Sequence, residues 1–200
     1  LHTATLRVAA KPFALNLRGA VAVSDAATIS NTGALQLGNV AADDMHFAGG
    51  LVATAPSTIT LAGVLRSDDA AITLGRTNST ISLVDSTDIN SGASSLRLVS
   101  PVSSGSHRLR LLSTGAAILD GNISGTAELR FVGPVTFSNA ATLTAASFDF
   151  GHSVSFGGVS NLSAGSVSFG GAVTAAGDFT VNGATSRSEE RRVGKECLRL

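Results

Sequence analysis

The chain has 200 residues and no formal net charge, and Ala, Ser, Gly and Thr together account for 97 of its residues. Trp and Tyr are absent, Cys and Met occur once each, and 14% of the residues are charged, against roughly 25% in an average soluble domain. This composition excludes a coiled coil, a disulfide scaffold, a basic nucleic-acid-binding protein and a charge-rich disordered chain.

Short β-strands are the predicted elements along the whole chain up to residue 186. Triplets with apolar first and third residues recur, and their middle residues are mostly polar, which is the period of a strand with one buried side. Gly, Asn, Ser and Asp separate the triplets and favour tight turns. Helical spacing is sustained nowhere, so we expect an all-β chain. The triplets are Leu6–Val8, Leu15–Leu17, Val21–Val23, Leu35–Leu37, Ile59–Leu61, Ile72–Leu74, Ile81–Leu83, Leu96–Leu98, Leu109–Leu111, Leu129–Phe131, Val135–Phe137, Phe148–Phe150, Val154–Phe156 and Val167–Phe169.

A fixed repeat emerges in the second half of the chain. Three 19-residue units align without a gap and place Phe131, Phe150 and Phe169 at equivalent positions, while Gly133, His152 and Gly171 occupy an expected corner. A 20-residue unit precedes them, but before residue 108 the triplet spacing is irregular, up to 24 residues, and defines no coil boundaries. The clearest repeats are residues 108–127, 128–146, 147–165 and 166–184.

Stacking of these units is expected because one unit buries too few apolar side chains to offset the entropy of ordering its backbone. The pattern therefore predicts a β-solenoid, most plausibly a parallel β-helix with coils of about 19–20 residues, in nine or ten coils and roughly 45 Å long. We expect Phe131, Phe150 and Phe169 to form one buried column. Two outward rows are also expected: Arg130 beside Asp149 and then Ser168, and the hydroxyls of Thr136, Ser155 and Thr174.

The Ala/Gly/Ser/Thr-rich, cysteine-free coils with Leu-x-Leu and Val-x-Phe triplets resemble the filamentous-haemagglutinin-like exoproteins of bacteria and related β-helical autotransporter passengers. The resemblance covers nearly all of residues 1–186 through composition and period. It implies a right-handed parallel β-helix that is exported across an outer membrane and acts at the cell surface as an adhesin, stalk or toxin-bearing rod. The export route, by two-partner secretion or as an autotransporter, is left open.

The last residues differ sharply from the rest. Residues 187–200 hold eight of the 28 charged side chains and the single cysteine, Cys197, whereas residues 1–186 carry a net charge of −2. The stretch 187–197 resembles the in-frame translation of a common sequencing adapter, and residues 198–200 are not explained by it. We therefore expect residues 187–200 to be a non-native tail, and residues 1–186 to be a β-helix repeat segment from inside a longer chain.

Chemical motifs are scarce, and we expect no catalytic, cofactor-binding or metal-binding residue. Nucleophile-elbow, phosphate-loop, zinc-protease and calcium-nonapeptide patterns are absent from the sequence. The four histidines are widely separated, with no spacing typical of metal ligands. Asp43, Asp44 and His46 are the closest approach to an acid–base or cation site, and we interpret them as a solvated turn. Asp68, Asp69 and the segment 85–88 are interpreted as turns as well.

The leading hypothesis is a non-catalytic structural or adhesive segment of a large exported bacterial surface protein, located at the cell surface. The alternative is a fragment of a β-helical carbohydrate-active enzyme, a polysaccharide lyase or hydrolase. Arg97, Arg108, Arg110 and Arg130 form the best outward cluster for a host-cell, glycan or neighbouring-cell surface, an anionic glycan in particular. The slightly acidic balance of residues 1–186 opposes nucleic-acid binding, and no stretch approaches the length of a membrane-spanning helix.

Overall fold

A computed structural model describes residues 1–187, which form 24 β-strands and no helix. Neighbouring strands pair in parallel and in register with the equivalent strands one turn away. The all-β class and the parallel β-solenoid are therefore confirmed. The hand of the coil stays a prediction, and the expected non-native tail lies outside the described residues, apart from the backbone of its first residue.

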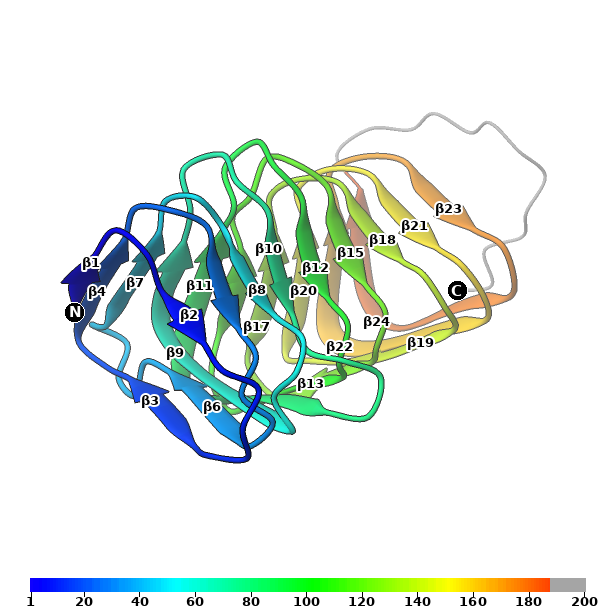
Figure 1. Ribbon diagram of the computed structural model, residues 1–200. Helices are drawn as coiled ribbons and strands as arrows, with labels where there is room; N and C mark the ends of the chain where they lie inside the picture. Colours follow the sequence, from blue (N-terminus) through cyan, green and yellow to red (C-terminus); the bar gives the residue numbers. More distant parts are fainter. Residues whose placement is uncertain (188–200) are drawn as a thin grey trace.

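Three strand columns run along the rod, so each turn has three sides (Figure 1). Face 1 contains β1 (His2–Thr3), β4 (Ala20–Val23), β7 (Asp44–Phe47), β14 (Leu109–Leu111), β17 (Glu128–Phe131) and β20 (Ser147–Phe150). Face 2 contains β2 (Arg7–Val8), β5 (Ala27–Ile29), β8 (Leu51–Ala53), β10 (Ile72–Leu74), β12 (Leu96–Leu98), β15 (Ala117–Leu119), β18 (Val135–Phe137), β21 (Val154–Phe156) and β23 (Val173–Ala175). Face 3 contains β3 (Leu15–Leu17), β6 (Ala34–Leu37), β13 (Val102–Gly105), β16 (Ile123–Gly125) and β19 (Ala141–Thr144). Four longer strands bend from face 3 into face 1: β9 (Thr58–Arg66), β11 (Thr80–Asn90), β22 (Ser160–Phe169) and β24 (Phe179–Arg187).

The face 2 sheet has nine strands, one for each turn, and at about 4.8 Å per turn the rod is about 43 Å long. The predicted 19-residue register holds from β17 to Asn182: Phe131 pairs with Phe150, and Phe150 with Phe169. It ends at Gly183, a one-residue corner where the preceding turn has two residues, so Ser166 pairs with Ala184 at a step of 18 and the predicted unit 166–184 is one residue too long. Val135, Val154 and Val173 pair in the same way on face 2. The two predicted outward rows, Arg130–Asp149–Ser168 and Thr136–Ser155–Thr174, are confirmed by the same registers.

Turns before residue 108 contain more residues because several of their corners are longer. The register steps from Ala20 to Asp44 and from Ile72 to Leu96, which is 24 residues in each case. Corners between faces 3 and 1 range from Ala62 alone to the six residues 38–43. The inward residues of neighbouring turns stay aligned, so the extra residues project from the edges of the rod and leave the stacked core intact.

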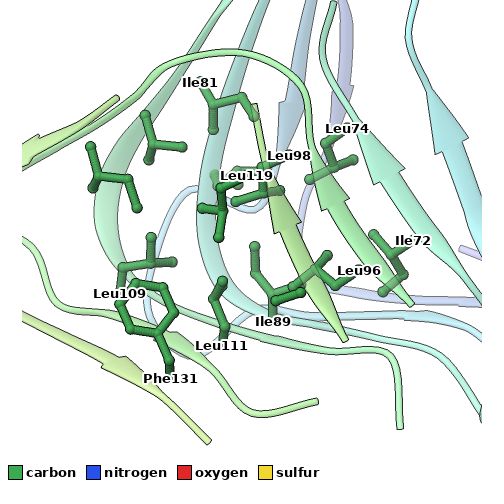
Figure 2. Packing of buried hydrophobic residues seen from close by; sticks show 14 of the residues in the cluster. Ile72, Leu74, Ile81, Ile89, Leu96, Leu98, Leu109, Leu111, Leu119 and Phe131 are labelled. Atoms are coloured by element: carbon green, nitrogen blue, oxygen red, sulfur yellow. The ribbon is translucent and has the colours of Figure 1, made fainter. Parts of the chain in front are cut away.

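The core is a continuous column of inward side chains, and Figure 2 shows its leucine and isoleucine section. There Ile89, Leu111 and Phe131 belong to consecutive turns and pack above one another. Further along the rod the Phe150 ring stacks on Phe131 at 4.9 Å and on Phe169 at 5.4 Å, measured between ring centroids, and all three are buried. The expected phenylalanine column is thus confirmed.

A second phenylalanine column runs beside the first. Its last ring comes from a residue that the strand register does not align with the others. Phe137 stacks on Phe156 at 5.1 Å, and the aligned residue of the next turn is Ala175. The volume that Ala175 leaves is filled by Phe179 of the next face, whose ring lies 4.7 Å from that of Phe156. Packing therefore continues through a residue four positions after the one that the repeat aligns.

Candidate functional site

Outward side chains differ in chemistry from face to face. Face 1 is charged, with acidic and basic residues on neighbouring strands. In the described turns, the outward positions of the face 3 strands carry hydroxyl and amide side chains and no charge. The charged outward residues of face 1 are Asp44, His46, Arg66, Asp88, Arg110, Glu128, Arg130 and Asp149. The corresponding residues of face 3 include Thr60, Ser82, Ser103, Ser124, Thr144, Ser163 and Asn182.

The four arginines proposed as an outward cluster lie on two faces. Arg108, Arg110 and Arg130 are neighbours on or beside face 1, whereas Arg97 projects from β12 on face 2. The structure therefore brings three of them together and separates the fourth.

Each of these arginines contacts an aspartate of an adjacent turn. Asp88 accepts a hydrogen bond of 2.8 Å from Arg110 Nε and lies 3.6 Å from Arg108 Nη2. The hydrogen bond from Arg110 holds the pKa of Asp88 below its usual range, against the opposing effect of burial. Arg130 Nε lies 3.2 Å from Oδ2 of Asp149, which belongs to the following turn. The carboxylates offset the positive charge, so these arginines do not form an open cationic surface.

The segment interpreted as a solvated turn is mostly a strand. Asp44 and His46 lie in β7 and point outward, because Met45 and Phe47 between and beside them are fully buried. Asp43 belongs to the preceding corner, where its buried carboxylate accepts a hydrogen bond of 2.8 Å from the backbone N–H of Asn39. The turn interpretation is therefore wrong for Asp44 and His46, because the strand alternation extends into them.

Two cross-turn contacts use the outward residues of β7. Arg66 Nε donates a hydrogen bond of 2.9 Å to Asp44 Oδ1, and His46 Nε2 lies 2.8 Å from Asp68 Oδ1. Asp43 takes part in neither contact. The two pairs lie next to each other and link the same two turns of the rod. The segment 68–69 forms a bend as expected. Residues 85–88 lie within β11, whose register shifts between Leu83 and Thr87, so the turn interpretation is wrong for Asp88, which is paired in the sheet.

A groove lies at the corner between faces 2 and 3, and we call it the corner groove. Its volume is about 450 Å³. The loop from β10 to β11 has five residues, 75–79, whereas the corners of the following turns, 99–101, 120–122 and 138–140, have three. The longer loop therefore stands beside a recess. The corner groove is lined by Thr77, Arg97, Val99, Pro101, Asp120, Gly121, Ser138 and Asn139.

The wall of the groove is held by buried hydroxyl groups. Ser79 Oγ and Ser100 Oγ are 2.5 Å apart, and each lies 3.0 Å from the Arg76 backbone nitrogen, which donates to both. Gly75, with a φ of +82°, allows this approach, since a Cβ there would lie 2.1 Å from Ser100 Oγ. These bonds tie the loop to the next turn and keep the groove open.

Arg97 and Asp120 form the charged pair of the groove. Arg97 Nε and Nη2 both lie 2.8 Å from Asp120 Oδ2. Asp120 Oδ1 is buried and has no hydrogen-bond partner among the described residues. Asn139 Nδ2 donates a hydrogen bond of 3.2 Å to the Asp120 backbone carbonyl, which places its amide at the rim. The groove therefore combines a guanidinium, a carboxylate, an amide and hydroxyls in one recess.

No group of three or more His, Cys, Asp or Glu side chains within residues 1–187 is arranged to hold a metal ion. The described chain likewise has no helix of the length and apolarity needed to cross a membrane. Comparison with protein-family models, with curated proteins and with solved structures finds no match.

Asp120, Thr77 and Asn139 were not identified from the sequence as candidate site residues. One signal pointed to the charged pairs: Arg97 and Asp120 are 23 residues apart, and Arg110 and Asp88 are 22, which is one turn of the rod. An arginine one turn from an aspartate therefore indicates a cross-turn pair. The recess itself had no such signal, because it depends on one loop, residues 75–79, that is longer than the equivalent corners of the next three turns.

Proposed function

We propose that residues 1–186 are a non-catalytic structural or adhesive segment of a large exported bacterial surface protein. The observation that carries this proposal is the uninterrupted stack of turns, whose inward residues form one core and whose outward residues form long ladders. Such a rod presents many equivalent side chains at a spacing of about 4.8 Å, which suits weak contacts repeated along a large partner.

The arrangement of charge supports a surface role over catalysis. The outward carboxylates Asp44, Asp88 and Asp149 are each engaged by an arginine of a neighbouring turn. Engagement of this kind links successive turns and occupies carboxylate oxygens that a general base would need to keep free. Export by two-partner secretion or as an autotransporter, and a location on the outer cell surface, belong to the same proposal through the resemblance to filamentous-haemagglutinin-like proteins.

A β-helical carbohydrate-active enzyme is the second candidate, and the corner groove favours it. Asp120 is a largely buried carboxylate beside Arg97, and a carboxylate next to a cationic group in a recess is a usual component of a polysaccharide-cleaving site. We favour the adhesive segment over the enzyme. The groove supplies one carboxylate, whereas glycoside hydrolysis normally needs two.

The experiment that separates the two candidates measures binding and turnover on the same sample. The full chain is immobilised and exposed to epithelial cells and to a panel of polysaccharides, while released reducing ends and unsaturated products are quantified. Retention of cells or polysaccharide without product supports the adhesive segment. Product formation that Asp120→Asn abolishes supports the enzyme and overturns our proposal.

A further inference from the structure

We propose that the corner groove is a binding site for an uncharged saccharide, with Arg97 and Asp120 as its polar centre. This inference rests on the proposed adhesive function and names the class of its ligand. The groove differs from the rest of the outer surface because it joins a recess to a charged pair whose guanidinium is half exposed.

The polar groups of the groove match vicinal hydroxyls. A sugar hydroxyl donates one hydrogen bond and accepts others, so it needs both kinds of partner in one place. Arg97 retains donors beyond those that it directs to Asp120, and the Asn139 amide supplies further donors at the rim. The hydroxyls of Thr77 and Ser138 supply acceptors, and Asp120 orients the Arg97 guanidinium. Val99 and Pro101 add the apolar area on which the C–H groups of a pyranose ring rest.

Charge balance selects an uncharged ligand over an anionic one. Arg97 and Asp120 compensate each other at 2.8 Å, so an entering carboxylate or sulfate would meet Asp120 as well as Arg97. The groove also opens beside face 3, where a longer saccharide would cross the outward hydroxyls of Ser103, Ser124 and Thr144. Hydroxyl groups bind a neutral polymer without the cations that a polyanion needs.

The groove is also preorganised for binding. The hydrogen bonds among Ser79, Ser100 and Arg76 hold its wall, and the corners that form its floor are tied to parallel strands on both sides. Gly121 lets the floor lie close to Pro101, since a Cβ at Gly121 would be 2.6 Å from the Pro101 nitrogen. A site whose walls are ordered before binding loses little conformational entropy when it takes its ligand.

The test is a binding titration on the full chain with defined oligosaccharides. Neutral hexasaccharides of glucose, mannose and galactose are compared with oligogalacturonate and hyaluronan fragments at low and high NaCl. We expect at least one neutral hexasaccharide to bind, with an affinity that changes less than about twofold with salt, because no ion pair is formed on binding.

Variants locate the site. Asp120→Ala and the loop variant Thr77→Arg, which adds bulk and charge to an exposed position, should each weaken binding about tenfold or more. Asp149→Ala is the matched control, because it removes the carboxylate of an equivalent cross-turn pair on face 1, and it should leave binding unchanged. Thermal melting by circular dichroism verifies that each variant is folded, and Thr77→Arg keeps the test decisive if Asp120→Ala unfolds.

Four results would overturn the inference. Binding that survives both groove variants places the ligand elsewhere and leaves the adhesive function standing. Binding restricted to the anionic fragments and lost at high salt assigns a polyanion instead. Adhesion to cells without affinity for any of the oligosaccharides refutes the saccharide site and leaves the adhesive function standing. Absence of binding to both cells and saccharides refutes the proposed function together with this site.

Discussion

Replacing Phe150 by Ala should destabilise the rod more than most single substitutions. The side chain is 1% exposed and its ring lies between those of Phe131 and Phe169, at centroid distances of 4.9 and 5.4 Å. Phe→Ala substitutions in cores cost about 3–5 kcal/mol, and the cost is higher where the walls of the cavity cannot relax. Hydrogen bonding between turns sets their spacing here, so we expect a loss of about 4 kcal/mol in the free energy of unfolding.

Urea denaturation followed by far-UV circular dichroism measures this loss, since the chain has no Trp or Tyr to report by fluorescence. Phe13→Ala is the matched control: Phe13 is 40% exposed, and its removal should change stability by less than about 0.5 kcal/mol. Combining Phe150→Ala with Phe131→Ala should reveal a coupling of about 0.5–1.5 kcal/mol for the stacked pair. A loss of unfolding free energy for Phe150→Ala as small as that for Phe13→Ala would refute the buried column.

Two further predictions concern charge and backbone conformation. Asp88 has a lowered pKa because Arg110 donates hydrogen bonds to it, so its contribution is present above the unfolded pKa of about 3.9 and is lost as pH falls through the lower folded value. Asp88→Asn should therefore cost about 1 kcal/mol of unfolding free energy at neutral pH and flatten the loss of stability below pH 4. Asp178→Asn, at an exposed site, should do neither. Parallel acid-denaturation curves for the two variants would contradict this prediction. Gly63 has a φ of +79° and a Cβ there would lie 2.2 Å from a backbone oxygen, so Gly63→Ala should cost about 2–4 kcal/mol in urea denaturation. Gly19 has a similar φ of +69° with open space around it, so Gly19→Ala should cost only about 1 kcal/mol, and equal losses at the two glycines would show that the close approach at Gly63 is absent.

The extent to which the sequence predicts this fold depends on the regularity of the corners. Between residues 128 and 182 the corners have constant lengths, so a 19-residue alignment predicted the Phe131 column and the Arg130–Asp149 row correctly. Before residue 108 the strands are equally clear, but corners such as residues 38–43 change the distance between equivalent positions. The triplets therefore predicted which residues are buried, and not which turns they join.

The site was less predictable because it depends on contacts between turns. Alternation predicts that Arg97 points outward, but not that Asp120 of the next turn lies 2.8 Å from it. Similarly, Phe179 fills the space beside Ala175 because of its position on the next face, which no single repeat shows. The corner groove arises from a length difference between loops, and such a difference has a meaning only after the turns are stacked.

The most direct test of the stacked rod is a pair of deletions within the regular repeat. Removing residues 147–165 deletes one full turn and brings the turn of Phe131 against that of Phe169 in the same register. This variant should keep its β-sheet circular dichroism and unfold cooperatively, with a urea dependence reduced by about one ninth, the share of one turn among nine. Removing residues 147–156 deletes two of the three sides of the turn and should abolish cooperative unfolding. Equal damage from the two deletions would contradict a rod built from interchangeable turns.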